Sequence, residues 1–185
     1  MANRVCPWWL GYLLASPVRR LLMDPGKILT PYVREGMTVL EPGPGMGFFT
    51  LELARLVGPS GHVVAVDIQP RMLAALKRRI GRAGLLDRVD IRLSASDTLR
   101  LTDLSGSVDF TLAFALVHEV PAVTSFFAEI AQASKPGAGL LFAEPAGHVK
   151  PAMFESELQA AVQAGFEIVQ HAAIRRSHAA FLKRT

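Results

Sequence analysis

The stretch from Thr38 to Thr50, TVLEPGPGMGFFT, places three glycines within five residues between two apolar runs, with an acid directly before them. Glycine carries no Cβ, so a loop of this kind suits either a tight turn or the close approach of backbone to a ligand. Three interpretations are open at this point: a plain turn, a phosphate-binding loop, or a pocket for another small molecule. The sequence around the glycines distinguishes these three interpretations.

The composition is that of a globular protein. The chain has 185 residues, of which 50% are hydrophobic and 19% charged, which favours a single domain with a substantial core. Its net charge of +4 is spread along the chain and by itself indicates little about nucleic acid. A single cysteine, Cys6, excludes an intramolecular disulfide and fits a reducing compartment. We therefore expect a cytoplasmic protein.

The N-terminal segment is the most ambiguous part of the sequence. Its apolar run after Arg4 has the rough form of a signal peptide, but Pro7 and the pair Trp8-Trp9 fit that interpretation poorly. The run is also too short to span a bilayer, so we expect no stable membrane insertion. We predict that residues 1–36 form a helical lid over a core of residues 37–185.

Hydrophobic periodicity predicts strands that alternate with helices. Strands are expected at Met37–Glu41, His62–Val66, Val89–Leu93, Val108–Val117 and Leu140–Ala143, helices at Phe48–Val57, Pro70–Gly81, Val123–Ser134 and Glu155–Ala164, and a closing hairpin at Glu167–Ile174 and His178–Lys183. Apolar strands that alternate with helices indicate an α/β fold with a parallel sheet. Ligands of such sheets bind at the carboxyl ends of the strands, where the glycine loop and the acid after the second strand should lie.

Two acids separate the cofactor classes. A dinucleotide loop has the pattern Gly-x-Gly-x-x-Gly, and here the spacing is one residue short. Glu41, directly before the glycines, would repel a pyrophosphate but attract an ammonium group. Asp67 ends the second strand, where a carboxylate can accept both hydroxyls of a ribose. The ligand implied has a ribose and a cationic part but no pyrophosphate, which disfavours a nicotinamide oxidoreductase.

An ordered set of motifs resembles one known family. The segments VLEPGPGMG, VVAVD, SASD, the apolar strand ending near HEV, and KPGAGLLFAEP are similar to the motifs of class I S-adenosylmethionine-dependent methyltransferases. The resemblance extends from about Met37 to the C-terminus. It implies a Rossmann-like fold with a seven-stranded, mostly parallel sheet of order 3-2-1-4-5-7-6, the last strand antiparallel, and helices on both faces. It also implies S-adenosylmethionine as cofactor and S-adenosylhomocysteine as product.

The resemblance assigns roles to particular positions. Around the methionine part and its methyl group it places Glu41, Gly43, Pro44, Gly45, Gly47, Phe48, Phe114 and Ala115, and around the ribose and adenine Asp67, Ile68, Gln69, Met72, Asp97 and Thr98. Glycines would let the backbone approach the cofactor closely. Asp67 would bind the ribose hydroxyls, Asp97 the adenine amino group, and the Thr98 amide a ring nitrogen.

Methyl transfer from a sulfonium needs mainly positioning, and a base helps only where the acceptor must lose a proton. His118, where the fourth strand ends, is the candidate base; a hydrogen-bonded structural histidine is the alternative. Motifs for nucleobase amines, arginine, arsenite and metal-assisted catechol methylation are absent, so we expect a metal-independent enzyme with a small-molecule acceptor. RNA or protein methylation, a non-catalytic S-adenosylmethionine-binding domain and a homodimer stay open.

Overall fold

The computed structural model describes residues 23–185. Cys6, the Trp8-Trp9 pair and most of the predicted lid lie outside the described residues. The described part of the N-terminal segment contains one short helix, α3 (Pro25–Leu29). Its N-cap, Asp24, accepts a hydrogen bond from the backbone N–H of Gly26, 3.0 Å from Oδ1, and Pro25 occupies the first turn, where it removes no hydrogen bond.

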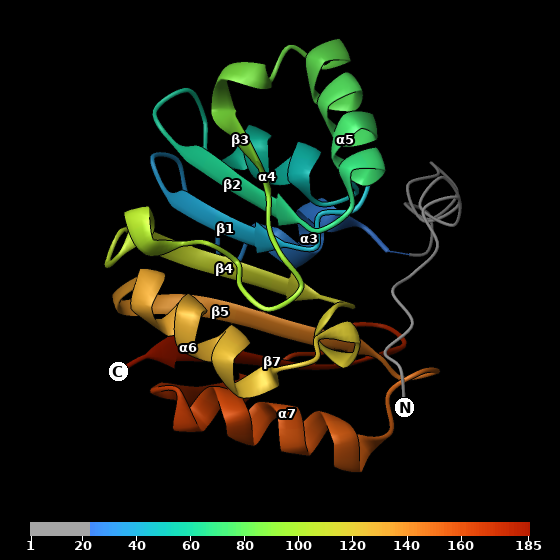
Figure 1. Cartoon of the computed structure of the whole chain (residues 1–185), viewed down its shortest axis with the longest axis vertical. Helices are drawn as coiled ribbons and strands as arrows, with labels where there is room; N and C mark the ends of the chain where they lie inside the picture. Colours follow the sequence, from blue (N-terminus) through green and yellow to red (C-terminus); the bar gives the residue numbers. More distant parts are fainter. Residues whose placement is uncertain (1–22) are drawn as a thin grey trace. The chain divides into compact units, whose positions relative to one another are not determined.

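Strands and helices alternate along the rest of the chain. The strands are β1 (Thr38–Pro42), β2 (His62–Asp67), β3 (Val89–Leu93), β4 (Val108–Phe114), β5 (Ser134–Pro145), β6 (Phe166–His171) and β7 (Ser177–Arg184). The longer helices are α4 (Thr50–Leu56), α5 (Pro70–Arg82), α6 (Val123–Ala133) and α7 (Pro151–Gln163), and 3-10 turns stand at Leu86–Arg88, Thr102–Leu104 and Val117–Glu119. Figure 1 shows these elements in sequence order.

The strands form one seven-stranded sheet in the order β3-β2-β1-β4-β5-β7-β6, with helices around it. β1, β2 and β3 pair in parallel, as do β4 and β5, while β7 runs antiparallel to both β5 and β6. The predicted Rossmann-like fold, strand order and antiparallel last strand are therefore confirmed.

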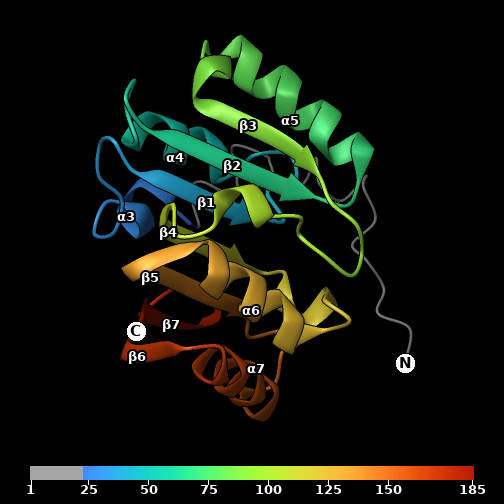
Figure 2. The ribbon, with the colours of Figure 1, turned by 60° about the vertical axis from the view of Figure 1, so that its left-hand side comes forward.

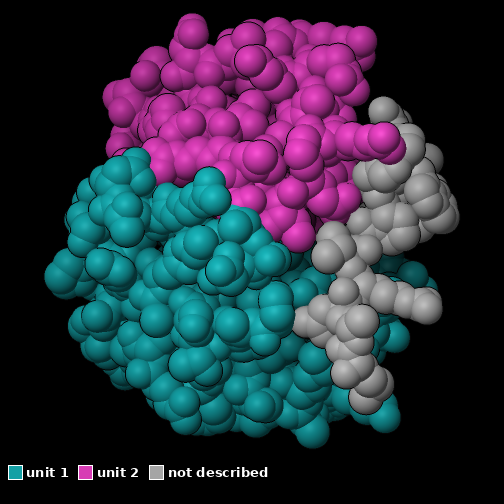
Figure 3. Space-filling view, in the orientation of Figure 1, with its two compact units in different colours: residues 1–4, 95–185 teal, residues 5–94 magenta. Residues whose placement is uncertain are grey.

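The described chain divides into two compact units, which Figure 3 colours separately. Unit 2 contains residues 23–94 and unit 1 contains residues 95–185, and each is described by itself. The prediction that the whole chain forms one domain stays a prediction.

Unit 2 is built from β1, β2 and β3 with α4 and α5. β1 and β2 are buried at nearly every position, and α4 and α5 pack against β2. α5 buries the stripe of Met72, Leu73, Leu76 and Ile80 that its sequence predicts, and it contacts β2 and β3. This packing holds the ends of β1 and β2, and so the glycine loop, in place.

Unit 1 is built from β4, β5, β6 and β7 with α6 and α7, which lie side by side in both views (Figures 1 and 2). Its core is rich in aromatic rings. Phe127 packs edge-on against Phe142 at 5.5 Å between ring centroids, and Phe142 stacks on Phe154 of α7 at 4.9 Å. These contacts fix α6 and α7 against β5.

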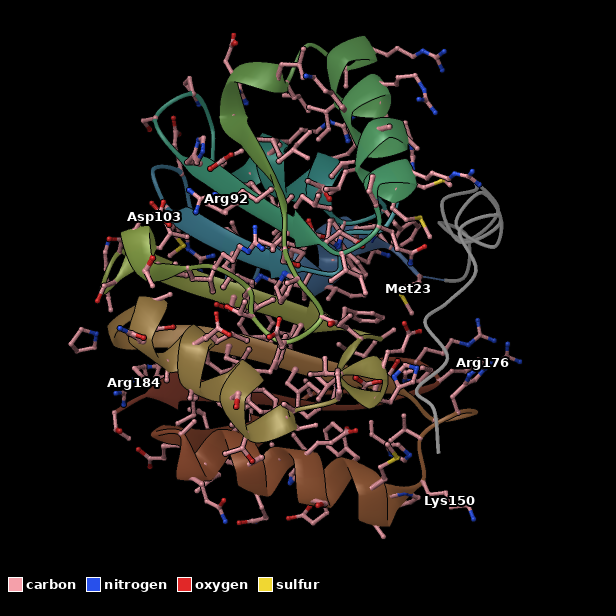
Figure 4. All side chains as sticks on the ribbon, viewed as in Figure 1. Met23, Arg92, Asp103, Lys150, Arg176 and Arg184 are labelled. Carbon is pink, nitrogen blue, oxygen red and sulfur yellow. The ribbon has the colours of Figure 1, made fainter. Side chains whose placement is uncertain are left out.

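The closing hairpin is also confirmed. Arg176, in the turn, adopts a positive φ of 59°, and Figure 4 shows it near the tip of the hairpin. Arg184, at the end of β7, donates hydrogen bonds to the carbonyls of Gly165 (2.7 Å) and Ala131 (3.2 Å), and so ties β7 to α6 and to the turn before β6.

Several predicted boundaries were wrong; β6, for example, ends at His171 rather than Ile174, and three other differences have identifiable reasons. β4 ends at Phe114 rather than at Val117, because Ala115 turns to a φ of 54° and the next backbone N–H groups bond to a side chain instead of a strand. β5 starts six residues earlier than predicted, since Lys135-Pro136-Gly137 lies within a strand whose register with β4 shifts there. α7 begins at Pro151, a residue that suits the first turn of a helix.

Candidate cofactor-binding and catalytic site

The glycine loop needs its glycines for two different reasons. Gly43, Gly45 and Gly47 all have positive φ, at 68°, 55° and 83°, a region that other residues adopt at a cost. A Cβ on Gly47 would lie 2.4 Å from Cδ1 of Leu76, so α5 packs directly against the loop. A Cβ on Gly45 would meet nothing within 4 Å in the described chain, so the backbone there borders open space.

The loop is fastened to its surroundings by backbone carbonyls. Gly43 N–H donates to the carbonyl of Val66 on β2 (2.8 Å), which extends the pairing of the two strands into the loop. The guanidinium of Arg79 on α5 donates to the carbonyl of Met46 (2.7 Å). This role of Arg79 was not predicted, because a helical pattern does not show which loop lies beside the helix.

Glu41 is the most unusual residue of the loop. It is 3% exposed at the end of β1, and in the described chain its Oε2 has no hydrogen-bond partner. Burial raises its pKa from 4.5 to about 8; the nearby Thr50 hydroxyl lowers it, without making a hydrogen bond within the described chain, and the charge of Asp67 raises it further. A buried carboxyl without a partner is costly, and a cationic ligand would compensate it.

Asp67 lies beside this loop, at the end of β2. Register pairs Glu41 with Ala65, so the two acids end neighbouring strands. Asp67 is buried, and its Oδ1 accepts a hydrogen bond from the backbone N–H of Gln69 (2.9 Å), which fixes the direction of the carboxylate. Ile68 is exposed next to it, where a flat apolar ligand surface could pack.

Two other predicted contacts in this unit are packed into the protein. Phe48 is buried, with its ring edge-on to Phe49 at 5.0 Å between centroids. Met72 is buried in a cluster with Met46 and Ala75, under the glycine loop. Both positions support the loop, and their contact with a cofactor stays a prediction.

Two of the predicted adenine contacts, Asp97 and Thr98, lie in a loop of unit 1 whose backbone is held by one glutamate. Asp97 is exposed, while the Thr98 hydroxyl donates to Oε2 of Glu129 on α6 (3.0 Å). The same oxygen accepts hydrogen bonds from the backbone N–H groups of Leu99 (2.9 Å) and Arg100 (3.2 Å). Sequence analysis missed Glu129; its position next to buried Ile130 on a largely apolar helix was the available signal.

The end of β4 turns sharply. Phe114 and Ala115, predicted to border the reacting methyl group, are both half-buried, and the Ala115 N–H donates to the carbonyl of Ala143 (2.8 Å). Ala115 then takes a left-handed φ, an uncommon conformation for a residue with a Cβ that often marks a functional site.

His118 follows this turn and is held by Glu144 at the end of β5. Glu144 is 0% exposed, and its Oε1 accepts hydrogen bonds from the N–H groups of Val117 (2.6 Å) and Leu116 (3.2 Å). Its Oε2 lies 2.5 Å from Nδ1 of His118. This hydrogen bond raises the pKa of His118, against the opposing effect of burial, and the charges of Glu144, Glu119 and Glu157 raise it further.

Further ionisable groups surround His118. Nε2 of His118 lies 3.8 Å from Oε1 of Glu119, and the ring of His148 is 6.4 Å away between centroids. Glu157 on α7 is 4% exposed, and neither of its carboxyl oxygens has a hydrogen-bond partner in the described chain. Burial and the charge of Glu144 raise the pKa of Glu157 to about 7. Neither Glu144 nor Glu157 was singled out from the sequence.

No helix within residues 23–185 is long and apolar enough to cross a membrane, and no group of histidine, cysteine and acidic side chains in this part of the chain could hold a metal ion.

Comparison with known proteins identifies the family. A family model described as a methyltransferase domain matches residues 33–181. A structure described as a SAM-dependent methyltransferase from Aquifex aeolicus is 25% identical with a TM-score of 0.87, covering 98% of this chain and 100% of that one. The chain belongs to the class I S-adenosylmethionine-dependent methyltransferase family.

Curated relatives match smaller portions. A ubiquinone/menaquinone biosynthesis C-methyltransferase from Azotobacter vinelandii is 35% identical over 60% of this chain and 44% of its own length. An arsenite methyltransferase from Halobacterium salinarum is 28% identical over 67% of this chain and 30% of its own. The chain spans less than half the length of these curated relatives.

Proposed function

We propose that this chain transfers a methyl group from S-adenosylmethionine to a small molecule. The observation that carries the proposal is the buried carboxyl of Glu41, whose Oε2 has no hydrogen-bond partner among residues 23–185, in a glycine loop where a Cβ on Gly45 would meet no described atom within 4 Å. An ammonium group is the ligand chemistry that compensates such a carboxyl. The relatives that are named as methyltransferases of a quinone precursor pathway and of arsenite support a small-molecule acceptor.

The residues present fit the cofactor. Glu41 and the backbone of Gly43, Gly45 and Gly47 would hold its amino-acid part, and Asp67, with its carboxylate direction fixed by Gln69, would accept the ribose hydroxyls. When bound, the cofactor supplies an electrophilic methyl group on a sulfonium.

The loop of unit 1 would serve the adenine. Asp97 is exposed there to accept from its amino group, and Glu129 holds the backbone of Leu99 and Arg100. Phe114 and Ala115 would border the methyl group, and His118 is the residue that would take a proton from the acceptor. The protein's task is then to bind, orient and exclude water, which is the main requirement for displacement at a sulfonium.

Asp67→Ala tests the cofactor assignment. We expect it to weaken S-adenosylmethionine and S-adenosylhomocysteine binding by about 1.5–3 kcal/mol, as for hydrogen bonds to a charged acceptor. Isothermal titration calorimetry measures this, with NAD titrated in parallel and expected to give no signal. Asp90→Ala is the matched control, since Asp90 lies on the neighbouring strand β3 and pairs with Arg92 (2.6 Å).

An unchanged affinity in a folded Asp67 variant would contradict the site, and binding of NAD alone would contradict the cofactor class. Transfer of a labelled methyl group to a small-molecule extract would separate an enzyme from a domain that only binds S-adenosylmethionine.

A further inference from the structure

We propose that Glu144 is a positioning residue that holds His118 with Nε2 as the proton acceptor, and that the methyl acceptor is therefore a group that arrives protonated, a weakly acidic hydroxyl. This inference rests on the proposed function for its substrate class, and on unit 1 alone for its geometry.

Glu144 is held in one orientation. Its Oε1 is engaged by two backbone N–H groups, from Leu116 and Val117, which directly precede His118. A carboxylate held at one oxygen by the segment that carries the histidine has little freedom left, so Oε2 is directed at Nδ1 of His118. The same glutamate thus ends β4, shapes the turn after it and orients the imidazole.

The orientation of Glu144 sets the tautomer of His118. Oε2 of an ionised carboxylate only accepts hydrogen bonds, so neutral His118 must carry its proton on Nδ1. Nε2 then holds the lone pair. Glu119 Oε1, at 3.8 Å, is too far from Nε2 to form a hydrogen bond with it. The side chain of His118 is 20% exposed. Nε2 is therefore the atom of this dyad that can receive a proton from a bound molecule.

The side chains around His118 also favour its role as a base. The groups that face His118 are mostly acidic: Glu144 from β5, Glu119 from its own 3-10 turn and Glu157 from α7, with His148 on the turn after β5. Negative charge around an imidazole stabilises the imidazolium that forms when it takes a proton, while Glu144 compensates that charge directly.

A histidine base narrows the chemical class of the methyl acceptor. A thioether or an amine that is already neutral attacks a sulfonium methyl group with a lone pair it already has, so it needs no base for bond formation. A phenol-type hydroxyl, with a pKa of about 10, must lose its proton as it is methylated and is the better match for a histidine whose pKa is raised. During methyl transfer the hydroxyl proton would move to Nε2 of His118 and the oxygen would form a bond to the methyl carbon. The electrons of the broken carbon–sulfur bond would stay on the sulfur.

NMR of the ¹⁵N-labelled protein tests the dyad without any substrate. The chain has five histidines, and His118→Gln assigns the His118 signals. In the wild type we expect the Nδ1–H tautomer and a pKa above the ordinary value of about 6.5. A predominant Nε2–H tautomer in the wild type would overturn the proposal.

Glu144→Gln provides the second measurement. Its amide oxygen can still accept from Leu116 and Val117, so the fold should be kept, while its NH₂ donates to Nδ1 and moves the ring proton to Nε2. We expect the pKa of His118 to fall toward 6.5 and the tautomer to switch. Glu119→Gln is the control: it removes a carboxylate near Nε2 and should lower the pKa less, with no change of tautomer.

Chemical modification gives an independent readout, since diethyl pyrocarbonate reacts with an unprotonated imidazole nitrogen. In the wild type, mass spectrometry should show His118 modification rising with pH above its raised pKa, and in Glu144→Gln this rise should begin at lower pH. Equal tautomers, pKa values and modification profiles in wild type and Glu144→Gln would overturn the proposal. Calorimetry with S-adenosylmethionine should be unchanged in Glu144→Gln, so a failure of the Asp67 test and a failure of the dyad are distinguishable.

Discussion

Glu41 has a different protonation state from the one its sequence position suggests. A glutamate is ordinarily ionised at pH 7, but burial raises the pKa of this carboxyl to about 8, so the neutral form of Glu41 predominates in the free protein at that pH. An ammonium ligand binds the ionised form. Binding and proton release are therefore coupled at this residue.

We expect S-adenosylmethionine binding at pH 7 to release close to one proton. Calorimetry in two buffers with different ionisation enthalpies measures this number directly. Glu41→Gln should bind more weakly and release none, because its side chain does not titrate. Glu52→Gln, an α4 acid paired with Arg55 at 3.1 Å, should behave as the wild type. Proton release that persists in Glu41→Gln would assign the coupling to another group.

At the scale of elements, single side chains decide where segments end. Glu144 ends β4 by taking the N–H groups of Leu116 and Val117 out of the strand, and Glu129 holds the loop after β3 from α6. Both glutamates contact segments about thirty residues away in the sequence, so neither role follows from local periodicity.

Glu129→Ala should loosen this loop. The N–H groups of Leu99 and Arg100 lose a charged acceptor, and a loss of about 1.5–3 kcal/mol corresponds to amide hydrogen exchange at least about tenfold faster. Exchange monitored by NMR at these two amides gives the answer. Thr98→Val removes one hydrogen bond to Glu129 and a second acceptor of the Arg100 N–H (3.1 Å), so the Leu99 amide is the site of comparison, and its exchange should change less than in Glu129→Ala. Glu155→Ala on α7 should have no effect, and unchanged exchange in Glu129→Ala would refute the role.

At the scale of the whole molecule, three buried or half-buried groups act on stability in the same direction. Glu41 and Glu157 have raised pKa values of about 8 and about 7, and His118 has a raised pKa. Between about pH 5 and pH 8 the folded chain therefore binds more protons than the unfolded chain. Linkage requires the free energy of unfolding to fall as pH rises through this range.

Urea denaturation at pH 5.5 and pH 8.5 measures this fall, to which the two glutamates should contribute about 5 kcal/mol. Glu157→Gln keeps the side-chain size but does not titrate, so it should be more stable than the wild type at pH 8.5 and the difference should shrink toward pH 5. Glu155→Gln, an exposed change on the same helix, should leave the pH dependence unaltered. Stability that rises with pH would contradict the buried, protonated state of these groups.

The sequence by itself determined the order of strands and helices, the glycine loop and the two acids at the ends of β1 and β2. Those features are local: apolar periodicity sets each element, and a glycine loop directly after a strand must lie at the carboxyl end of that strand. Glu41, Asp67 and His118 were accordingly singled out from their positions in the sequence, and their roles stay predictions.

Only the tertiary structure decided which groups surround them. Four features depend on segments that meet through folding: the lack of a partner for Glu41 Oε2 within residues 23–185, the hydrogen bonds of Glu144 and of Glu129, and the burial of Glu157. Hydrogen bonds and burial are properties of neighbours in space. A sequence motif therefore names the ionisable residues, while packing sets their pKa, their direction and their chemistry.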